Sequence, residues 1–423
     1  MNEGQAAQLK VPELRVSAVW TLGGLAAGLA LGLVLRGTEL LAAALRVAEP
    51  VGALWLRGLQ MTILPLVASL LFVGIVRTVA AASAGALARR TLVWFAGVLL
   101  AGAIAAAVLM PTILAAVPIP PAAAGALAPA IAVRDAAPVP GLADFVTSLV
   151  PVNVIASAAE NAMLPVIVFV ALFALAATRL DPLHTRQLHL LFEAIAGAMM
   201  VVIGWVLALA PVGVFALSLG VAARSGVAAV GALAHYIVAV SAMGLLVAIV
   251  AYGVAMLAAR LRLRDFARAA LPAQAVAIST QSSLATLPAM LAACRSLGVR
   301  QETADFVLPL AVTLFRATGP AMNVAVAIYA ATLAGVELTP QALAAGVVVS
   351  LLTTLGAPSL PGTISFVVSI APIAVAMGAP LGPLALLVAV EMLPDIMRTA
   401  GNVTMDVAVA AAVDRKRAAD AIS

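Results

Sequence analysis

One segment near the C-terminus, EMLPDIMRTAGNVTMD at residues 391–406, carries most of the information about the architecture of this chain. It places three carboxylates, a guanidinium and an amide between two apolar runs. Asp395, Arg398, Asn402 and Asp406 follow one another at spacings of three, four and four residues. Such spacings put all four side chains on one face of a helix.

The apolar runs on either side, LALLVAV at 384–390 and VAVAAAV at 407–413, have the composition of a bilayer-spanning helix. A charge at the centre of a membrane costs roughly 2.5–3.5 kcal/mol on insertion scales, so such a residue normally faces a protein interior or a wet cavity. A polar stripe between these runs therefore predicts a binding site for a ligand or an ion.

The composition indicates an all-α polytopic membrane protein. Of the 423 residues, 64% are hydrophobic and only 10% are charged, and the mean hydropathy is +1.17. A soluble domain carries about 25% charged residues. Several apolar runs approach or exceed about 18 residues, the length of a membrane-spanning helix, and no strand-period alternation suggests a barrel.

The basic residues indicate topology rather than a nucleic-acid partner. The net charge is +5 and the pI is near 10.1, but the arginines lie in short loops between apolar runs, where a basic excess marks the cytoplasmic side. The excess falls on the N-terminal tail, the Arg77–Arg90 turn, the Arg179 loop, the Arg260–Arg268 cluster and the tail at 415–417. We therefore expect both termini in the cytoplasm.

The remaining reactive residues offer no cofactor or zinc site. Cys294 is the only cysteine, which excludes an intrachain disulfide, and His184, His189 and His235 form no ligand motif. Residues 1–16 are polar and precede a full-length apolar run, a pattern that indicates an uncleaved membrane anchor.

The C-terminal half departs from the rhythm of simple spans. Residues 279–286, STQSSLAT, carry six hydroxyl or amide side chains in eight positions. A lipid-exposed helix would not carry this load, whereas a re-entrant hairpin whose tip is buried in protein would. A span interrupted by RATGP at 316–320 follows, and then a second apolar piece has the Gly/Pro/Ser tip TTLGAPSLPGT at 353–363.

A hairpin followed by a broken helix thus occurs twice, which is the pattern of inverted-repeat secondary transporters. Their site lies near the midplane, where the tips meet the unwound helices. The alternative is a pair of proline-kinked spans with ordinary packing serines. That alternative leaves the buried charges without a purpose.

Three motifs resemble the dicarboxylate/amino acid:cation symporter family, the glutamate transporter group. SSLATLP at 282–288 and LPG at 360–362 resemble the tips of its two hairpins, and DIMRTAGNVTMD at 395–406 resembles its eighth helix. Residues 56–66 and 149–165 are similar to its second and fourth helices. The similarity is therefore colinear over nearly the whole chain.

The resemblance implies eight transmembrane helices plus two re-entrant helical hairpins, inverted repeats, a homotrimer and a glutamate-transporter-like elevator fold. It assigns spans 1 and 2 (1–80) and spans 4 and 5 (142–224) to a scaffold domain. The other expected segments are span 3 (81–117), an exposed loop (118–141), span 6 (225–264), hairpin 1 (265–299), span 7 (300–336), hairpin 2 (337–378), span 8 (379–414) and a cytoplasmic tail (415–423). The transport domain comprises spans 3, 6, 7 and 8 with both hairpins.

The resemblance also implies roles for individual residues. Arg398 would grip the side-chain carboxylate of an acidic substrate and Asp395 its amino group, in keeping with the planar fork of a guanidinium. The implied substrate-binding residues are Ser282, Ser283, Pro361, Gly362, Asp395, Arg398, Thr399 and Asn402, and the implied sodium ligands are Asn402 and Asp406. We add Arg316 to the expected substrate-binding residues, although the family pattern has no arginine there. A purely structural alternative is that Arg398 only pairs with Asp395 or Asp406.

The seventh helix departs from the family pattern. The family usually carries Asn-Met-Asp-Gly-Thr, whereas this chain has Phe-Arg-Ala-Thr-Gly at 315–319. The aligned stretch of the third helix, WFAGVL at 94–99, has no oxygen side chain, so one sodium site is expected to be absent. We expect Arg316 to occupy cation space and to pair with Asp406 or the substrate. Alternatively, it points away toward Glu302, Asp305 or a carbonyl.

These features predict a symporter of small carboxylates, with aspartate and glutamate as the leading substrates and with altered cation coupling. The alternative is a C4-dicarboxylate or neutral amino acid carrier of the same fold. Three possibilities stay open for coupling: Na⁺, H⁺ through a carboxylate such as Glu391, or no coupling ion. Channel and enzyme functions fit less well, because the polar residues form compact tips and no nucleophile–base pair is evident. The expected location is the bacterial inner membrane.

Overall fold

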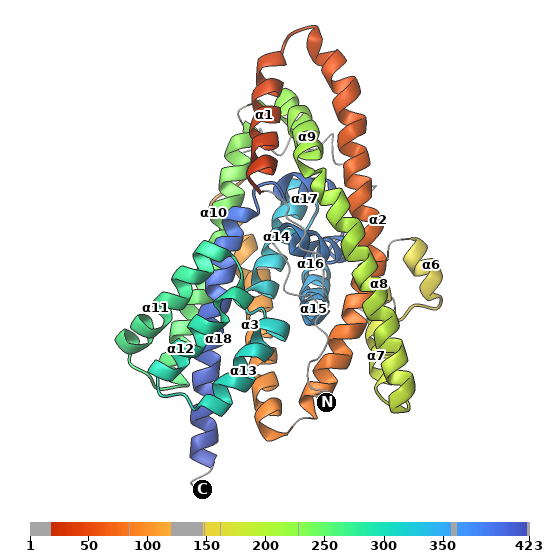
Figure 1. The fold of residues 1–423 in the computed structure, drawn as a ribbon. Coiled ribbons are helices and arrows are strands. Elements are labelled where there is room, and N and C mark those ends of the chain that lie inside the picture. The colour runs from red at the N-terminus through yellow and green to blue at the C-terminus, as the bar shows by residue number, and fades with distance from the viewer. Residues whose placement is uncertain are drawn as a thin grey trace.

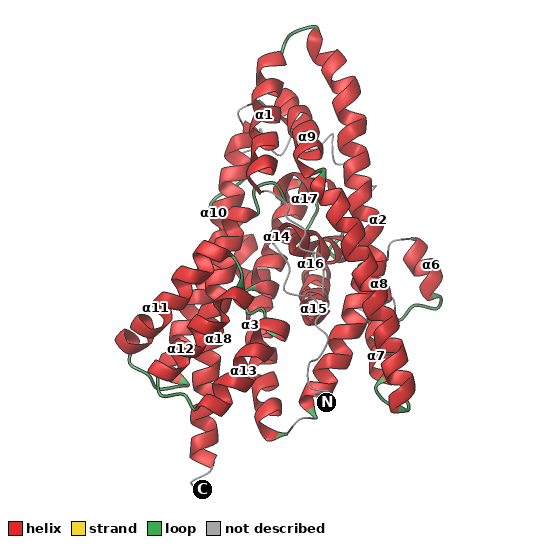
Figure 2. Ribbon diagram, in the orientation of Figure 1, coloured by secondary structure: helices red, strands yellow, loops and turns green. Residues whose placement is uncertain are grey.

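Every regular element is a helix in the computed structural model, which describes residues 18–83, 85–119, 147, 149–160, 162–226, 228–356 and 362–420 (Figure 2). The all-helical expectation is therefore confirmed for these residues. The described helices divide into two groups by their contacts, and Figure 1 shows both groups running roughly along the long direction of the molecule.

The first group forms the narrow upper end and the right side of Figure 1. In it α1 packs along α9, while the long helix α2 contacts α7, α8 and α9 in turn. Its members are α1 (Ala18–Leu35), α2 (Leu40–Ala82), α6 (Val154–Ala159), α7 (Met163–Ala177), α8 (Pro182–Ala208) and α9 (Ala210–Ser225). These are the helices expected to form the scaffold.

The second group surrounds the charged helix α18 (Met392–Asp420), which packs on α10, α11, α12 and α13. Its helices are α3 (Ala86–Ala116), α10 (Ala228–Leu257), α11 (Leu263–Thr280), α12 (Ser283–Ser296), α13 (Gln301–Leu314), α14 (Gly319–Leu333), α15 (Pro340–Gly356), α16 (Gly362–Ala376) and α17 (Gly382–Leu387). The pair α15 and α16 packs on α14 and also touches α2, so it joins the two groups.

Five helical stretches within the described residues are long and apolar enough to cross a membrane. They are Leu40–Ala82, Ala86–Ala116, Pro182–Ala208, Val230–Leu257 and Gln301–Leu333. Four other apolar helices are shorter, Trp20–Leu35, Met163–Ala177, Ala210–Ala223 and Pro340–Leu355. The chain is thus a multi-pass membrane protein, while the count of eight spans stays a prediction. The loop expected at 118–141 lies outside the described residues from residue 120 onward.

Helix breaks occur where the sequence carries Gly, Pro or polar clusters. The RATGP motif separates α13 from α14, and Pro320 lies in the first turn of α14, where its missing N–H is not needed. A further break, a turn at 388–391 between α17 and α18, was not anticipated, because span 8 was expected to be continuous from 379. Pro394 in the first turn of α18 accounts for this break in the same way.

Asp414 near the end of α18 fixes this helix to the start of α13. Its carboxylate accepts hydrogen bonds from Arg300 Nε at 2.8 Å and from Thr303 Oγ1 at 2.6 Å. The Arg300 guanidinium also donates to the Asp414 carbonyl at 3.0 Å. These hydrogen bonds fix the position of α18 along its axis relative to α13, and so the position of its polar side chains.

Glycines set the spacing between α1 and α9. A Cβ added at Gly28 would overlap Ser218 Oγ and the Phe215 carbonyl, and one at Gly32 would lie 2.6 Å from the Leu219 carbonyl. Ser218 Oγ lies 3.3 Å from the Leu25 carbonyl across the same contact. Gly28 and Gly32 thus allow α1 and α9 to approach closely, as in other small-residue helix contacts.

Valine at Gly28 should therefore destabilise the protein by about 1–3 kcal/mol, because the backbones must separate to accept the side chain. Thermal unfolding in detergent measures this effect. Gly23→Val is the matched control, since a Cβ at Gly23 meets nothing within 4 Å, and it should change stability by less than about 0.5 kcal/mol. Equal melting temperatures for the two variants would contradict the packing argument.

Candidate functional site

The charged segment of α18 lies in the interior of the second helix group. Asp395, Arg398, Thr399, Asn402 and Asp406 are each between 2% and 5% exposed. Asp395 stands in the first turn of the helix, where the positive end of the helix dipole favours a carboxylate. These residues share a protein-facing side, as their spacing predicts.

Arg398 is the centre of a buried network of hydrogen bonds. Its Nη2 donates to Glu391 Oε1 at 2.7 Å, its Nη1 donates to Asn323 Oδ1 at 2.7 Å, and its Nε lies 3.3 Å from Asp395 Oδ1. All three nitrogens of the guanidinium therefore have partners from α14, α18 and the turn before α18. Breaking such a buried pair by removing one partner typically costs about 3–5 kcal/mol.

The network extends from Glu391 to α10. Tyr236 is fully buried and donates its hydroxyl proton to Glu391 Oε2 at 2.7 Å. The Tyr236 ring packs edge-on against Tyr329, with 5.3 Å between the ring centroids. Tyr329 lies 3.2 Å from His235 Nδ1, and His235 Nε2 lies 2.9 Å from the Val117 carbonyl at the end of α3. A row of polar groups thus leads from the site toward the end of α3.

The break between α13 and α14 faces the same cluster. Thr318 donates its backbone N–H to Asn402 Oδ1 at 2.8 Å, and its Oγ1 lies 2.9 Å from the same oxygen and 3.1 Å from the Arg398 carbonyl. The Asn402 side chain therefore holds the unwound segment against α18. Arg316, in that segment, has Arg398 and Asp395 as its charged neighbours.

The expected hairpin tips are placed only in part. Helices α11 and α12 pack on each other and on α18, and two residues, Gln281 and Ser282, link them. Gln281 adopts a left-handed conformation with φ 50°. Ser282 caps α12 by accepting a hydrogen bond from Ala285 N at 3.2 Å, and Ser283 is the first residue of that helix. At the second tip Gly362 begins α16, while Pro361 lies outside the described residues.

An aromatic pair fills the space where α3 meets the break of the seventh helix. Phe95 and Phe315 stack with 4.1 Å between their centroids and 6° between their planes. Both side chains are buried, at 3% and 0% exposed. The resemblance would place sodium ligands at this position, and the stack puts carbon there.

Asp406 has an unusual environment for a carboxylate. It is 2% exposed, and its Oδ1 has no hydrogen-bond partner within the part of the chain that the structure describes. An ionised carboxylate without a partner is costly in such a place, so this group is suited to hold a proton or a cation. Among the described residues, no three or more His, Cys, Asp or Glu side chains cluster so that they could bind a metal ion.

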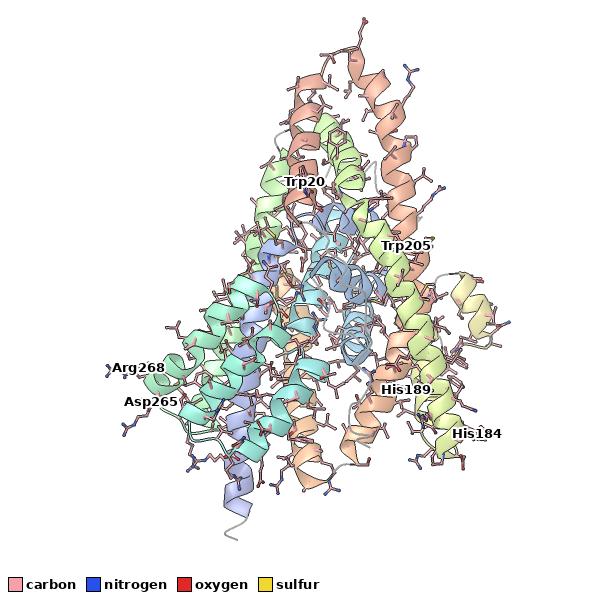
Figure 3. All side chains as sticks on the ribbon, in the orientation of Figure 1. Trp20, His184, His189, Trp205, Asp265 and Arg268 are labelled. Carbon is pink, nitrogen blue, oxygen red and sulfur yellow. The ribbon has the colours of Figure 1, made fainter. Side chains whose placement is uncertain are left out.

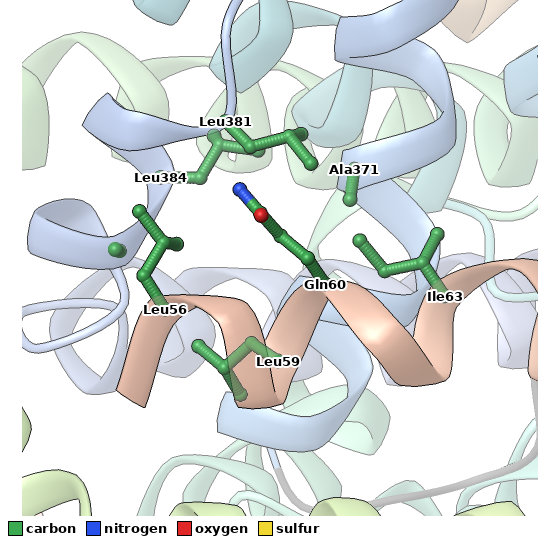
Figure 4. A pocket seen from close by; sticks show the side chains of 8 residues that line it. Leu56, Leu59, Gln60, Ile63, Ala371, Leu381 and Leu384 are labelled. Carbon is green, nitrogen blue, oxygen red and sulfur yellow. The ribbon is translucent and has the colours of Figure 1, made fainter. Parts of the chain in front are cut away.

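Other polar residues lie away from this cluster. In Figure 3 His184 and His189 mark the lower end of α8 on one side of the molecule, and Asp265 and Arg268 project from α11 on the other. A small pocket between α2 and the α16–α17 region has room for about one water molecule, roughly 20 Å³. Figure 4 shows the Gln60 side chain reaching into this pocket among leucines. It is too small for a dicarboxylate.

Sequence reasoning found the residues of α18 but not all of their partners. Tyr236, Thr318 and Asn323 were not expected in the site, although Asn323 stands out as the one amide within α14. Glu391 was expected only as a carboxylate that might exchange protons, whereas it directly binds Arg398. Tyr236 gave no signal in its sequence context, because a tyrosine in an apolar helix normally packs.

Apolar helices of membrane-spanning length that enclose paired charges at two helix breaks define a membrane transport protein. The chain belongs to the sodium:dicarboxylate symporter family, whose family model matches residues 18–416. The resemblance noted in the sequence is therefore confirmed. Since this family consists of transporters, the expectation of a non-enzyme is supported.

Individual relatives agree with this assignment. The proton/glutamate-aspartate symporter of Escherichia coli K12 is 32% identical over 264 residues, which cover 62% of this chain and 60% of the relative. The proton/sodium-glutamate symport protein of Bacillus subtilis 168 is 28% identical over 90% of this chain and 88% of its own length. C4-dicarboxylate transport protein 3 of Ralstonia nicotianae is 29% identical over 65% of this chain and 62% of its own length.

Proposed function

We propose that this symporter carries small carboxylates across the bacterial inner membrane, with aspartate and glutamate as its preferred substrates. The observation that supports this proposal is the buried pair of Arg398 and Asp395, whose closest atoms are 3.3 Å apart. A guanidinium binds a carboxylate through two parallel hydrogen bonds, and an aspartate side chain complements an ammonium group. An acidic amino acid offers both groups to the two residues at once.

Substrate binding must disturb the existing network. The Nη2 of Arg398 is occupied by Glu391, so a substrate carboxylate takes over a place that the protein's own carboxylate holds. Once displaced, an ionised Glu391 would be buried without its countercharge, at a cost of several kcal/mol. Protonation of Glu391 removes this cost. We therefore propose that Glu391 takes up the coupling proton as the substrate binds.

Sodium coupling is proposed to differ from the family pattern. The Phe95–Phe315 stack supports the loss of one sodium site, because aromatic carbon cannot coordinate a hard cation. Asp406 is the candidate ligand of a second sodium site, and its unpartnered Oδ1 supports that role. Asn402 is a weaker candidate through its side chain, whose oxygen is engaged by Thr318.

A C4-dicarboxylate is the second candidate substrate. Arg316 lies near Arg398 and Asp395, so two guanidiniums border the same region, and two guanidiniums suit a ligand with two carboxylates. The relative from Ralstonia nicotianae carries the name of a C4-dicarboxylate transport protein. Asp395 distinguishes the two candidates, since it favours a ligand with an amino group over one without. A neutral amino acid would leave one guanidinium without a ligand carboxylate.

Thermal unfolding of the purified protein with a panel of ligands tests the substrate class. Aspartate, glutamate, succinate, malate, serine and alanine are each added with and without sodium, at a neutral and an acidic pH. A ligand that binds only the folded state raises the melting temperature. Stabilisation by aspartate or glutamate is expected, and succinate or malate alone would favour the second candidate. Stabilisation by serine or alanine alone would overturn the acidic-substrate proposal.

The arrangement of helices suggests how the site changes sides. The contacts of α1, α2 and α7–α9 are mainly with one another, and those of α18 are with the second group. We propose that the second group moves past the first as an elevator, in a homotrimer with cytoplasmic termini. The first group would then be the scaffold domain and the second group the transport domain, with the helix pairs α11–α12 and α15–α16 as its re-entrant hairpins.

Glu391→Gln should separate substrate exchange from proton-driven uptake. Glutamine keeps a hydrogen-bonding group beside Arg398 but cannot carry a proton in this pH range. In liposomes we expect counterflow of labelled aspartate to persist, while an imposed pH gradient no longer accelerates uptake. Glu193→Gln is the matched control. Glu193 on α8 is also paired with an arginine, Arg77 on α2 at 2.9 Å, but this pair lies in the first helix group, away from the site. Full pH-gradient stimulation in Glu391→Gln would refute the coupling role.

A further inference from the structure

A cavity of about 650 Å³ lies between α3 and α10, separate from the charged cluster. Its walls are apolar side chains of both helices, together with Ala317, Ala321 and Met405 at its inner end. On α3 the lining includes Val93, Trp94 and Gly97. The lining side chains are apolar apart from the indole N–H of Trp94, so the cavity is suited to hydrocarbon.

The size and position of the cavity point to a lipid chain. Apolar cavities of about 150 Å³ already stay dry and take up benzene, and this one is more than four times larger. Its walls reach the outer surface, since Val93 is 71% exposed and Val250 is 47% exposed. Both residues lie on helices of membrane-spanning length, so in a bilayer the opening would border the lipid chains.

The register of α3 places basic groups at one end of this cavity. The lining residues Val93, Trp94, Gly97 and Val98 repeat every four positions, and the same face continues back by one turn to Arg89 and Arg90. The Arg89 side chain is exposed. The expected topology puts this end of α3 on the same cytoplasmic side as the arginines that follow α10.

We propose that the cavity binds one acyl chain of an anionic phospholipid, whose phosphate contacts Arg89. A guanidinium is a preferred partner of phosphate oxygens, and anionic lipids are attracted to arginines at the cytoplasmic surface. The bound chain fills the gap between α3 and α10 and so links them. This proposal does not depend on which carboxylate is carried.

Trp94 in the cavity wall reports directly on the occupant. Trp20 on α1 and Trp205 on α8, both labelled in Figure 3, are 71% and 65% exposed, whereas Trp55 is buried and donates its indole N–H to the Val206 carbonyl. A Trp20→Phe/Trp205→Phe variant therefore leaves Trp94 as the lipid-accessible fluorophore. Phosphatidylglycerol with a brominated acyl chain should quench it saturably in detergent, and unlabelled phosphatidylglycerol should reverse the quenching.

Gly97→Leu is the decisive variant. Gly97 lines the cavity and a Cβ added there meets nothing within 4 Å, so we expect the leucine side chain to extend into the cavity. It should abolish saturable quenching, while Gly23→Leu, at an equally open position of α1, should not. Arg89→Gln should weaken phosphatidylglycerol about fivefold and leave phosphatidylcholine unchanged. Circular dichroism and unfolding temperature show that each variant is folded.

Two results would overturn the proposal. Quenching that rises linearly with lipid and is equal in Gly97→Leu would mean that lipids only cover the outer surface. Equal affinity for phosphatidylglycerol and phosphatidylcholine, unchanged by Arg89→Gln, would reject the headgroup contact and with it the anionic lipid. Neither result would bear on substrate binding, which the melting-temperature panel measures in the same preparations.

Discussion

Replacing Arg398 by methionine is expected to abolish measurable binding of aspartate and glutamate. The variant keeps an unbranched apolar stem but removes the guanidinium that would receive the substrate carboxylate. Loss of one partner of a buried, hydrogen-bonded charge pair costs about 3–5 kcal/mol, equivalent to a decrease in affinity of roughly a hundred- to several thousandfold. Calorimetric titration with aspartate measures this loss.

The same substitution should also lower stability, because Glu391 and Asp395 lose their shared countercharge. Adding Glu391→Gln removes one of the two uncompensated carboxylates, so the double variant should regain stability without regaining binding. This contrast separates the structural role of Arg398 from its role in recognition. Arg77→Met serves as a control, since Arg77 pairs with Glu193 in the first helix group, away from the network. Wild-type aspartate affinity in Arg398→Met would end the proposed recognition mode.

Arg316→Met is expected to increase the sodium dependence of transport. A fixed positive charge 4 Å from a monovalent cation disfavours it by about 4 kcal/mol at an effective dielectric constant of 20, or on the order of a thousandfold in affinity. Methionine is the residue that the family pattern has at this position. Uptake of labelled aspartate into liposomes with and without a sodium gradient measures the change.

The position of Arg316 directs this experiment. Its charged neighbours are Arg398 and Asp395. The charge of Arg316 therefore acts on the residues that we propose bind the substrate. Arg268→Met is the matched control, because Arg268 projects from the outer side of α11 (Figure 3). Strict sodium dependence of the unmodified protein would contradict the idea that Arg316 replaces a cation. An unchanged sodium response in Arg316→Met would do the same.

Charge in an apolar setting made α18 predictable from the sequence. Asp395, Arg398, Asn402 and Asp406 could not face lipid, so their burial on one protein-facing side followed from spacing and solvation alone. The breaks at 281–282 and 315–318 were predictable for a related reason, because glycine, proline and clustered hydroxyls interrupt apolar helices there. These local rules needed no knowledge of the tertiary contacts.

The pairing of the charges was not predictable in the same way. Which acceptor Arg398 binds depends on how α10, α14 and the turn before α18 come together, and no spacing rule relates residues 75 or more positions apart, such as Asn323 and Arg398. The same holds for Tyr236, because its hydroxyl belongs to the site only through its hydrogen bond to Glu391, 155 residues away. The turn at 388–391 was not predicted, because the apolar residues on both sides of it favour a continuous helix. Pro394, just after the turn, is the one signal for the break in the sequence.

The arrangement around Arg398 has an electrical consequence for the return of the empty carrier. Two arginines, Arg316 and Arg398, are balanced by Glu391 and Asp395, so the vacant cluster has no formal net charge when these two acids are ionised and Asp406 holds a proton. Displacing one unit charge through the membrane field involves about 2.3 kcal/mol per 100 mV. A cluster without net charge crosses the membrane without this electrical energy. The loaded carrier adds one acidic amino acid with charge −1 and one proton with charge +1, so its net charge is unchanged. Uptake by this route should therefore be insensitive to voltage.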